Sequence, residues 1–206
     1  PFGSSFRMVC RSVIWWPGRL NCAIAHRSPA SRLLSRIPSP EGVTRLAIDS
    51  DQRQVYGADA RGTLYWWELS EEGIRHPLAS ETGSPISALS LLVGGRSVVV
   101  GHGDGSLSIW FRVRTGRAHS ELVRAHVLES QGAAIRSIAP SWRKRSFAAL
   151  GEDGEIGLYH TTSERTLWRG SAPAGDVSAA ALAPRGDALY LASRSGVSAF
   201  AVRNHH

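Results

Sequence analysis

Residues 86–113 read ISALSLLVGGRSVVVGHGDGSLSIWFRV, and this stretch decides the fold. It contains three short apolar runs, the turns between them are rich in Gly, and the third run carries Trp110. Short β-branched or aromatic runs bounded by turn residues predict β-strands joined as hairpins.

The same pattern occurs three more times, as VTRLAIDSDQRQVYGADARGTLYWWEL from Val43, IRSIAPSWRKRSFAALGEDGEIGLYHT from Ile135 and VSAAALAPRGDALYLASRSGVSAFAVR from Val177. The starts are 43, 49 and 42 residues apart. Each copy places a Gly 19 residues after its first residue: Gly62, Gly105, Gly154 and Gly196. A strand-built period of this length is typical of β-propeller blades. We therefore predict an all-β fold of WD40-like propeller blades, and we interpret the recurring Gly as a hairpin residue with positive φ.

A large aromatic residue closes the third run of each copy: Trp67, Trp110, Tyr159 and Phe200. We expect these rings to fill the space between neighbouring blades, because large rings bury much area per residue. An outer fourth strand is expected at 75–80, 122–129 and 165–170, and none after Val202. The last blade should thus have three strands, which predicts a partial or incomplete ring.

Charge divides the chain into two parts. The net charge is +7, but residues 1–40 hold six Arg and no acid, so residues 41–206, the four repeats, are nearly balanced. A protein that binds many phosphates needs a basic face. Only the run 143–145, Arg-Lys-Arg, provides one in the repeats, and we interpret it as a solvated hairpin tip. We expect no specific nucleic-acid binding.

Residues 1–40 differ in kind from the repeats. They contain both cysteines, Cys10 and Cys22, with many Ser and Pro and no convincing period. Three interpretations remain open for this leader: a disordered segment, a targeting peptide of the mitochondrial type, or an out-of-frame reading of GC-rich DNA. Under any of them we expect the leader to contribute little to the folded core.

The repeats lack the sequence patterns of catalysis. His102 is next to an Asp in a Gly-rich turn, but the same turn recurs without His in the other copies, so hairpin geometry explains it. His119 and His126 are seven residues apart on an expected strand and do not predict a metal site. A nucleophile also needs a neighbouring base and an orienting group. We therefore predict a protein that is not an enzyme, with no catalytic, metal-binding or cofactor-binding residues.

The repeats resemble degenerate WD40 blades, with Trp67-Glu68, Trp110-Phe111 and Tyr159-His160 where that family has Trp-Asp. The Gly-His that normally precedes the first strand is missing, so we do not expect the family's buried His-Ser-Asp-Trp network.

A closer resemblance is to the extracytoplasmic propeller-like domain of long-form permease subunits of bacterial phosphate ABC transporters. It is carried by 56–62 running into 64–69, by 135–140 and by 196–206, and it covers residues 41–206. The resemblance implies a non-catalytic accessory domain on the periplasmic side of the inner membrane. Its partners would be other transporter subunits or a binding protein, with membrane contact only through segments outside this chain.

A free-standing, cytoplasmic WD40-like scaffold that binds other proteins is the alternative, and the fold does not decide between the two. Sequence beyond His206 would decide. Apolar spans of about 20 residues favour the transporter, whereas further repeats favour the scaffold.

Overall fold

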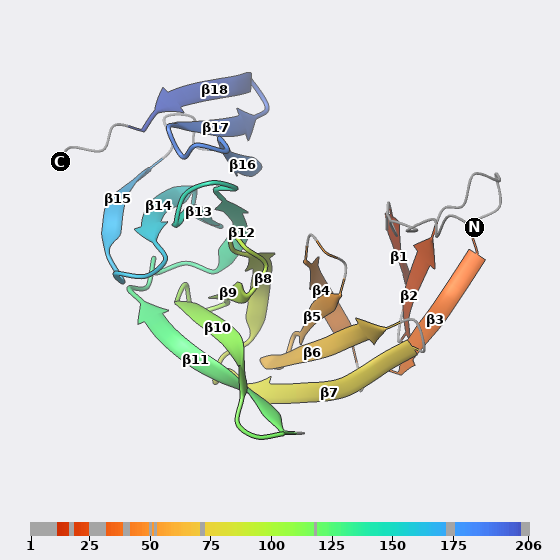
Figure 1. The fold of residues 1–206 in the computed structure, drawn as a ribbon. Helices are drawn as coiled ribbons and strands as arrows, with labels where there is room; N and C mark the ends of the chain where they lie inside the picture. Colours follow the sequence, from red (N-terminus) through yellow and green to blue (C-terminus); the bar gives the residue numbers. More distant parts are fainter. Residues whose placement is uncertain are drawn as a thin grey trace, which may run out of the picture.

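The chain folds as antiparallel β-sheets that follow one another around an arc (Figure 1). This computed structural model describes residues 12–16, 19–24, 32–38, 42–49, 51, 53–70, 73–117, 119–171 and 176–202, with the side chains of 12–38 and 70–77 left out. No helix occurs among these residues. The all-β prediction is therefore confirmed.

Each repeat of the sequence forms one sheet. Sheet 1 contains β4 (Val43–Ile48), β5 (Gln54–Asp59), β6 (Thr63–Ser70) and β7 (Gly73–Glu81). Sheet 2 contains β8 (Ile86–Leu91), β9 (Ser97–His102), β10 (Leu107–Arg114) and β11 (Ser120–Leu128). Sheet 3 contains β12 (Ile135–Pro140), β13 (Ser146–Gly151), β14 (Glu155–His160) and β15 (Thr166–Ser171). Sheet 4 has only β16 (Ala179–Leu182), β17 (Ala188–Ser193) and β18 (Gly196–Ala201), so the predicted strand number is confirmed in every repeat.

The strands of each sheet pair in chain order, from an inner first strand to an outer last one (Figure 1). Two arginines of inner strands connect neighbouring sheets. Arg45 Nε donates to Ser87 O of β8 at 2.8 Å, and Arg136 Nη1 donates to Val177 O, just before β16, at 2.9 Å. No closed ring is formed by the part of the chain that the structure describes.

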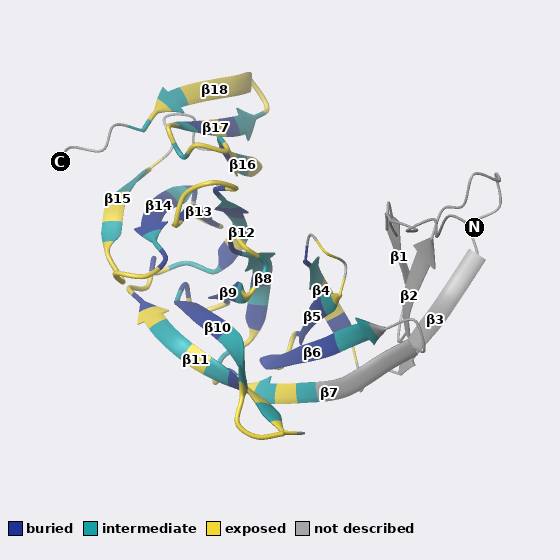
Figure 2. Cartoon of the chain, viewed as in Figure 1, coloured by how far each residue is buried: buried dark blue, intermediate teal, exposed yellow. Residues whose placement is uncertain are grey.

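Three of the four hydrophobic clusters lie between neighbouring sheets, and the fourth, which contains Trp67, belongs to sheet 1 alone (Figure 2). One cluster joins Trp66 of sheet 1 to Val100 of sheet 2, a second joins Leu107 of sheet 2 to Phe147 of sheet 3, and a third joins sheets 3 and 4. Strands buried on both faces, such as β13 with its run SFAALG, read as continuous apolar stretches for this reason.

A further antiparallel sheet occupies the segment that the sequence marked as an atypical leader. It contains β1 (Ser12–Trp16), β2 (Arg19–Ile24) and β3 (Arg32–Pro38). The composition of residues 1–40 did not predict these strands, because no period-two alternation marks them. Cys10 and the side chains of the leader lie outside the described residues, so its small contribution to the core stays a prediction.

Candidate interaction surface

Three of the recurring glycines lie in hairpin turns between the second and third strands, as predicted, and Gly196 is the first residue of β18, directly after such a turn. Their φ angles are all positive: Gly62 +103°, Gly105 +81°, Gly154 +83° and Gly196 +132°. A Cβ atom at Gly105 would also lie 2.6 Å from Ala133 O, so that turn excludes larger residues on two grounds. These positions are structural.

The predicted aromatic positions are buried in three of the four sheets. Trp67, Trp110 and Tyr159 have exposed fractions of 3%, 4% and 0%. Trp110 packs in the cluster between sheets 1 and 2, and Tyr159 packs between sheets 2 and 3. Phe200 is only half-buried, which corrects the expectation of an equivalent core role. The reason is that β18 is an edge strand, whereas β11 and β15 cover the corresponding strands of sheets 2 and 3.

Sheet 2 contains a buried polar chain that the sequence analysis missed. His102 ends β9 with an exposed fraction of 3%, and its Nε2 lies 2.9 Å from Ser108 Oγ. Trp110 Nε1 donates to the same hydroxyl at 2.8 Å, and His102 Nδ1 lies 3.3 Å from Ser84 O. Burial lowers the pKa of His102, although Ser84 and Asp104 oppose the shift. The alternation of His102, Ser108 and Trp110 around the turn was the available signal, since all three point to one face of the hairpin.

In sheet 1, the position that corresponds to His102, at the end of the second strand, is occupied by an acid. Asp59 ends β5, and its carboxylate accepts hydrogen bonds from Tyr65 Oη at 3.0 Å and from the Thr63 and Arg61 amides at 2.9 Å. Burial alone would raise the pKa of Asp59, but these hydrogen bonds outweigh it and the pKa is lowered. Tyr65 in turn stacks on Trp67 with ring centroids 5.6 Å apart.

Sheet 3 uses a residue from outside its own hairpin. Gly151 ends β13, and Gln131 from the preceding turn supplies the polar group beside it. Gln131 Nε2 donates to Tyr159 Oη at 2.8 Å. In each of the three sheets, a polar side chain thus hydrogen-bonds to an aromatic residue of the core.

Among the described residues, no group of three His, Cys, Asp or Glu side chains is placed to hold a metal ion. His126 of sheet 2 contacts Glu164 in the β14–β15 turn of sheet 3, and this pair connects the two sheets. His126 therefore has Glu164, not His119, as its partner. No helix in the described part of the chain is long and apolar enough to cross a membrane.

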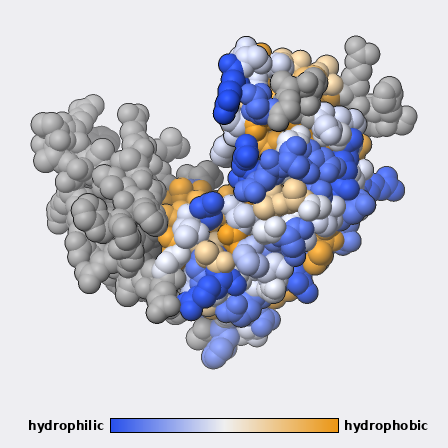
Figure 3. Space-filling view, turned by 180° about the vertical axis from the view of Figure 1, so that it is seen from behind, coloured by the Kyte–Doolittle hydropathy of each residue, from blue (hydrophilic) through white to orange (hydrophobic). Residues whose placement is uncertain are grey.

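The outward side of sheet 4 is the most distinctive surface. Leu182, Leu189 and Leu191 pack against sheet 3, so the alternate residues of sheet 4 face away from it. These residues form what we call the Ala-rich face: Ala179, Ala181, Ala188, Tyr190, Ala192, Val197, Ala199 and Ala201. Tyr190 and Val197 are 43% and 73% exposed. Apolar colour is visible over this sheet at the top of Figure 3.

Comparison with known proteins gives no relative: neither a protein-family model nor a curated protein matches the chain.

Proposed function

We propose that the chain is a non-catalytic β-propeller domain that docks on a protein partner through the Ala-rich face. The observation that carries this is the absence of charged and amide side chains from all eight positions of the face. Contiguous exposed apolar surface of this kind marks interaction sites in folded proteins.

The interface between sheets 3 and 4 indicates which side chains a partner surface needs in order to pack on the Ala-rich face. Sheet 3 presents Ala148 with Leu150 and Leu158 to sheet 4, and leucines of sheet 4 fill the spaces that the small residues leave. The Ala-rich face presents mostly methyl groups around Tyr190. A partner sheet with large apolar side chains is therefore complementary to it.

The propeller arrangement and the transporter assignment belong to this proposal. The repeat period and the order of the strands within each sheet support the propeller arrangement. The resemblance described above is what supports a domain of a phosphate transporter permease subunit, on the periplasmic side. Other transporter subunits or a binding protein would then be the partners. A free-standing scaffold is the alternative, and it would use the same face.

The test is photocrosslinking from the face in the source organism, with p-benzoylphenylalanine at Tyr190 of the full chain. The matched control carries the same group at Arg117, which is exposed in the β10–β11 turn. We expect position 190 to crosslink to one defined protein and position 117 not to. Transporter subunits among the products support the transporter domain, and a soluble protein supports the scaffold. If neither position crosslinks to a protein, or both do so equally, the docking proposal is wrong.

A further inference from the structure

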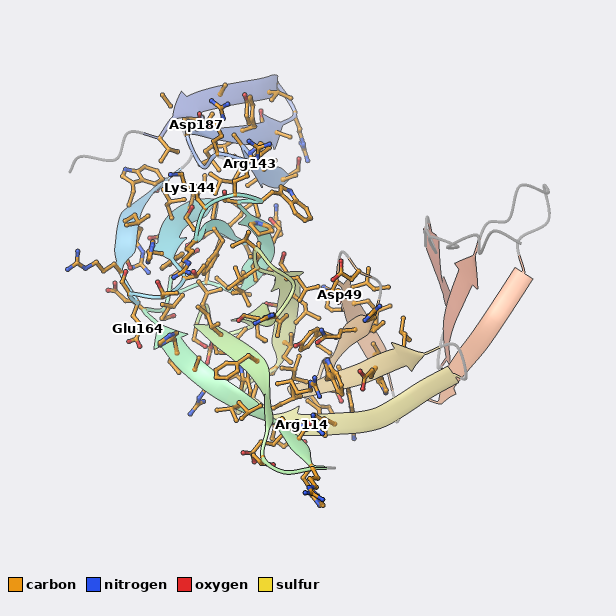
Figure 4. The ribbon with its side chains drawn as sticks, viewed as in Figure 1. Asp49, Arg114, Arg143, Lys144, Glu164 and Asp187 are labelled. Atoms are coloured by element: carbon orange, nitrogen blue, oxygen red, sulfur yellow. The ribbon has the colours of Figure 1, made fainter. Side chains whose placement is uncertain are left out.

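The β12–β13 turn, Ser141 to Arg145, is unlike the other turns of the molecule. Trp142 at its tip is 69% exposed, the most exposed of the tryptophans whose side chains the structure describes. The three following residues, Arg143, Lys144 and Arg145, are exposed cations. Figure 4 shows Arg143 and Lys144 where sheet 3 meets sheet 4. We call residues 142–145 the Trp142 tip.

Hydrogen bonds of Ser141 and of the β16–β17 turn fix the backbone of the Trp142 tip. Ser141 Oγ accepts hydrogen bonds from the amides of Lys144 at 3.0 Å and Arg143 at 3.4 Å, and it donates to Pro184 O at 2.9 Å. The Arg143 amide donates to Pro184 O as well, at 2.9 Å. The exposed ring is thus presented by a fixed backbone, which lowers the entropy lost when a partner binds.

The cations of the tip are not neutralised within the fold. None of the three forms an ion pair with any side chain that the structure describes. Arg185, in the adjacent β16–β17 turn, adds a fourth exposed cation, and Asp187 is the one acid of that turn. Because the three cations of the tip are exposed and form no ion pair with a described side chain, they are available to an anionic partner.

The two ends of the sheets carry opposite charge. In antiparallel sheets, the turns after first and third strands lie at one end and the remaining turns at the other. At the Trp142 end, cations outnumber acids in the described turns and their flanking strand residues: Arg53, Arg96, Arg114, Arg117, Arg143, Lys144, Arg145, Arg165 and Arg185 against Asp49, Asp51, Glu164 and Asp187. The opposite end is acidic: Asp59, Glu81, Asp104, Glu129, Glu152, Asp153, Glu155 and Asp176 against Arg61 and Arg194.

We propose that the Trp142 tip docks on the surface of an anionic lipid bilayer. Trp prefers the boundary between headgroups and hydrocarbon, and each Lys or Arg near an anionic membrane adds about 1 kcal/mol of attraction. The acidic end would be repelled by the same surface, so the charge division orients the domain with Trp142 toward the lipid. This inference goes beyond the proposed function and does not rest on it.

Shape and charge together favour a bilayer over a nucleic acid or an acidic protein. Nucleic-acid binding needs a basic groove or stripe that follows several phosphates, whereas the Trp142 tip is a projecting turn. A protein partner would need a preformed pocket for the indole of Trp142. A bilayer surface is planar and can accept an inserted indole ring without a preformed pocket. It therefore fits a projecting turn that lies at the cationic end of the molecule.

The test uses a nitroxide label at the tip of the full chain. In a Cys10→Ser, Cys22→Ser background, one variant carries Trp142→Cys and the matched control carries Trp168→Cys, at an exposed Trp on β15. We expect vesicles with about 30 mol % phosphatidylglycerol to shield label 142 from a water-soluble relaxation agent, and label 168 to stay accessible. Because the readout is local, binding through the six Arg of residues 1–40 does not mimic it.

Vesicle sedimentation gives the energetic test. Each of Arg143→Ser, Lys144→Ser and Arg145→Ser should weaken partitioning by about fivefold. Arg194→Ser, which removes an exposed cation from the acidic end, should not weaken it. Binding should also fall as salt is raised above ~0.1 M. Equal accessibility of labels 142 and 168 on vesicles overturns the proposal, and so does shielding of label 142 by duplex DNA or by an acidic protein but not by vesicles.

Discussion

Ser108 Oγ lies 2.9 Å from His102 Nε2 while it accepts a hydrogen bond from Trp110 Nε1 at 2.8 Å. On the other side of the imidazole, Nδ1 lies 3.3 Å from the carbonyl oxygen of Ser84, which can only accept. The proton of the neutral ring is therefore on Nδ1, and Ser108 donates to Nε2. The chain Trp110, Ser108, His102, Ser84 is fully satisfied only when His102 is uncharged.

This arrangement predicts a pH-dependent stability. Burial holds the pKa of His102 below its usual 6.5, so the unfolded chain binds a proton more readily than the folded one. The stabilisation is present above pH 6.5 and is lost as the pH falls toward the lowered value. We expect the free energy of unfolding to decrease from pH 7.5 to pH 5.5, measured by chemical denaturation, and the His102→Gln variant to show a smaller decrease. Equal decreases in both proteins would contradict the buried neutral imidazole.

A carboxylate in the same turn titrates in a separate range. Hydrogen bonds from Ser106, led by its side chain at 2.6 Å, and from Ser84 lower the pKa of Asp104 to about 2. Its contribution to stability is present above about pH 4 and is lost below that value, toward pH 2. The contributions of His102 and Asp104 are therefore distinguishable in one series of unfolding free energies measured against pH. The His102→Gln variant should still lose stability below about pH 4, because Asp104 is unchanged.

The turn glycines are predicted to differ in how strictly they are required. Gly105→Ala and Gly154→Ala both place a side chain at positive φ, which costs on the order of 1 kcal/mol. A Cβ at Gly105 would also meet Ala133 O at 2.6 Å and Gly132 N at 2.8 Å, whereas one at Gly154 meets nothing within 4 Å. We expect Gly105→Ala to lose at least 1 kcal/mol more in chemical unfolding. Equal losses would mean that φ alone governs these turns.

Two tryptophans provide a matched pair for the core. Trp110 is 4% exposed between sheets 1 and 2, and Trp168 is 50% exposed on β15. Truncation of Trp110 to Ala should cost about 3–5 kcal/mol of unfolding free energy, because it removes a large buried ring. Truncation of Trp168 should cost less than about 1 kcal/mol. A loss below about 1 kcal/mol at Trp110 would show that its ring is not part of the core.

The sequence predicted the strands because each short apolar run and the Gly turn beside it are local signals, and their recurrence in four repeats reinforces them. Gly62 and Trp67 can be placed from one repeat alone, and their turn and burial are confirmed. Phe200 could not, because its exposure depends on whether another strand covers β18, which is a tertiary fact. The polar partners were missed for the same reason: Gln131 is 28 residues from Tyr159, and no periodicity links them. The Ala-rich face needed the pairing register of sheet 4, which the run AAAL in β16 does not fix.

The buried pair Gln131 and Tyr159 leads to the last prediction, at a glycine that the repeat pattern does not mark. Gly157 lies on β14, and a Cβ there would come within 2.5 Å of both Gln131 Nε2 and Tyr159 Oη. Both partners are fixed in the core, so they have little room to move, and overpacking of this kind costs about 1–3 kcal/mol. Gly103→Ala is the matched control, because the nearest atoms to its Cβ are 3.8 Å away. We expect Gly157→Ala to lower the midpoint of thermal unfolding clearly and Gly103→Ala to leave it nearly unchanged, whereas similar midpoints for the two variants would mean that Gln131 does not occupy the space beside Gly157.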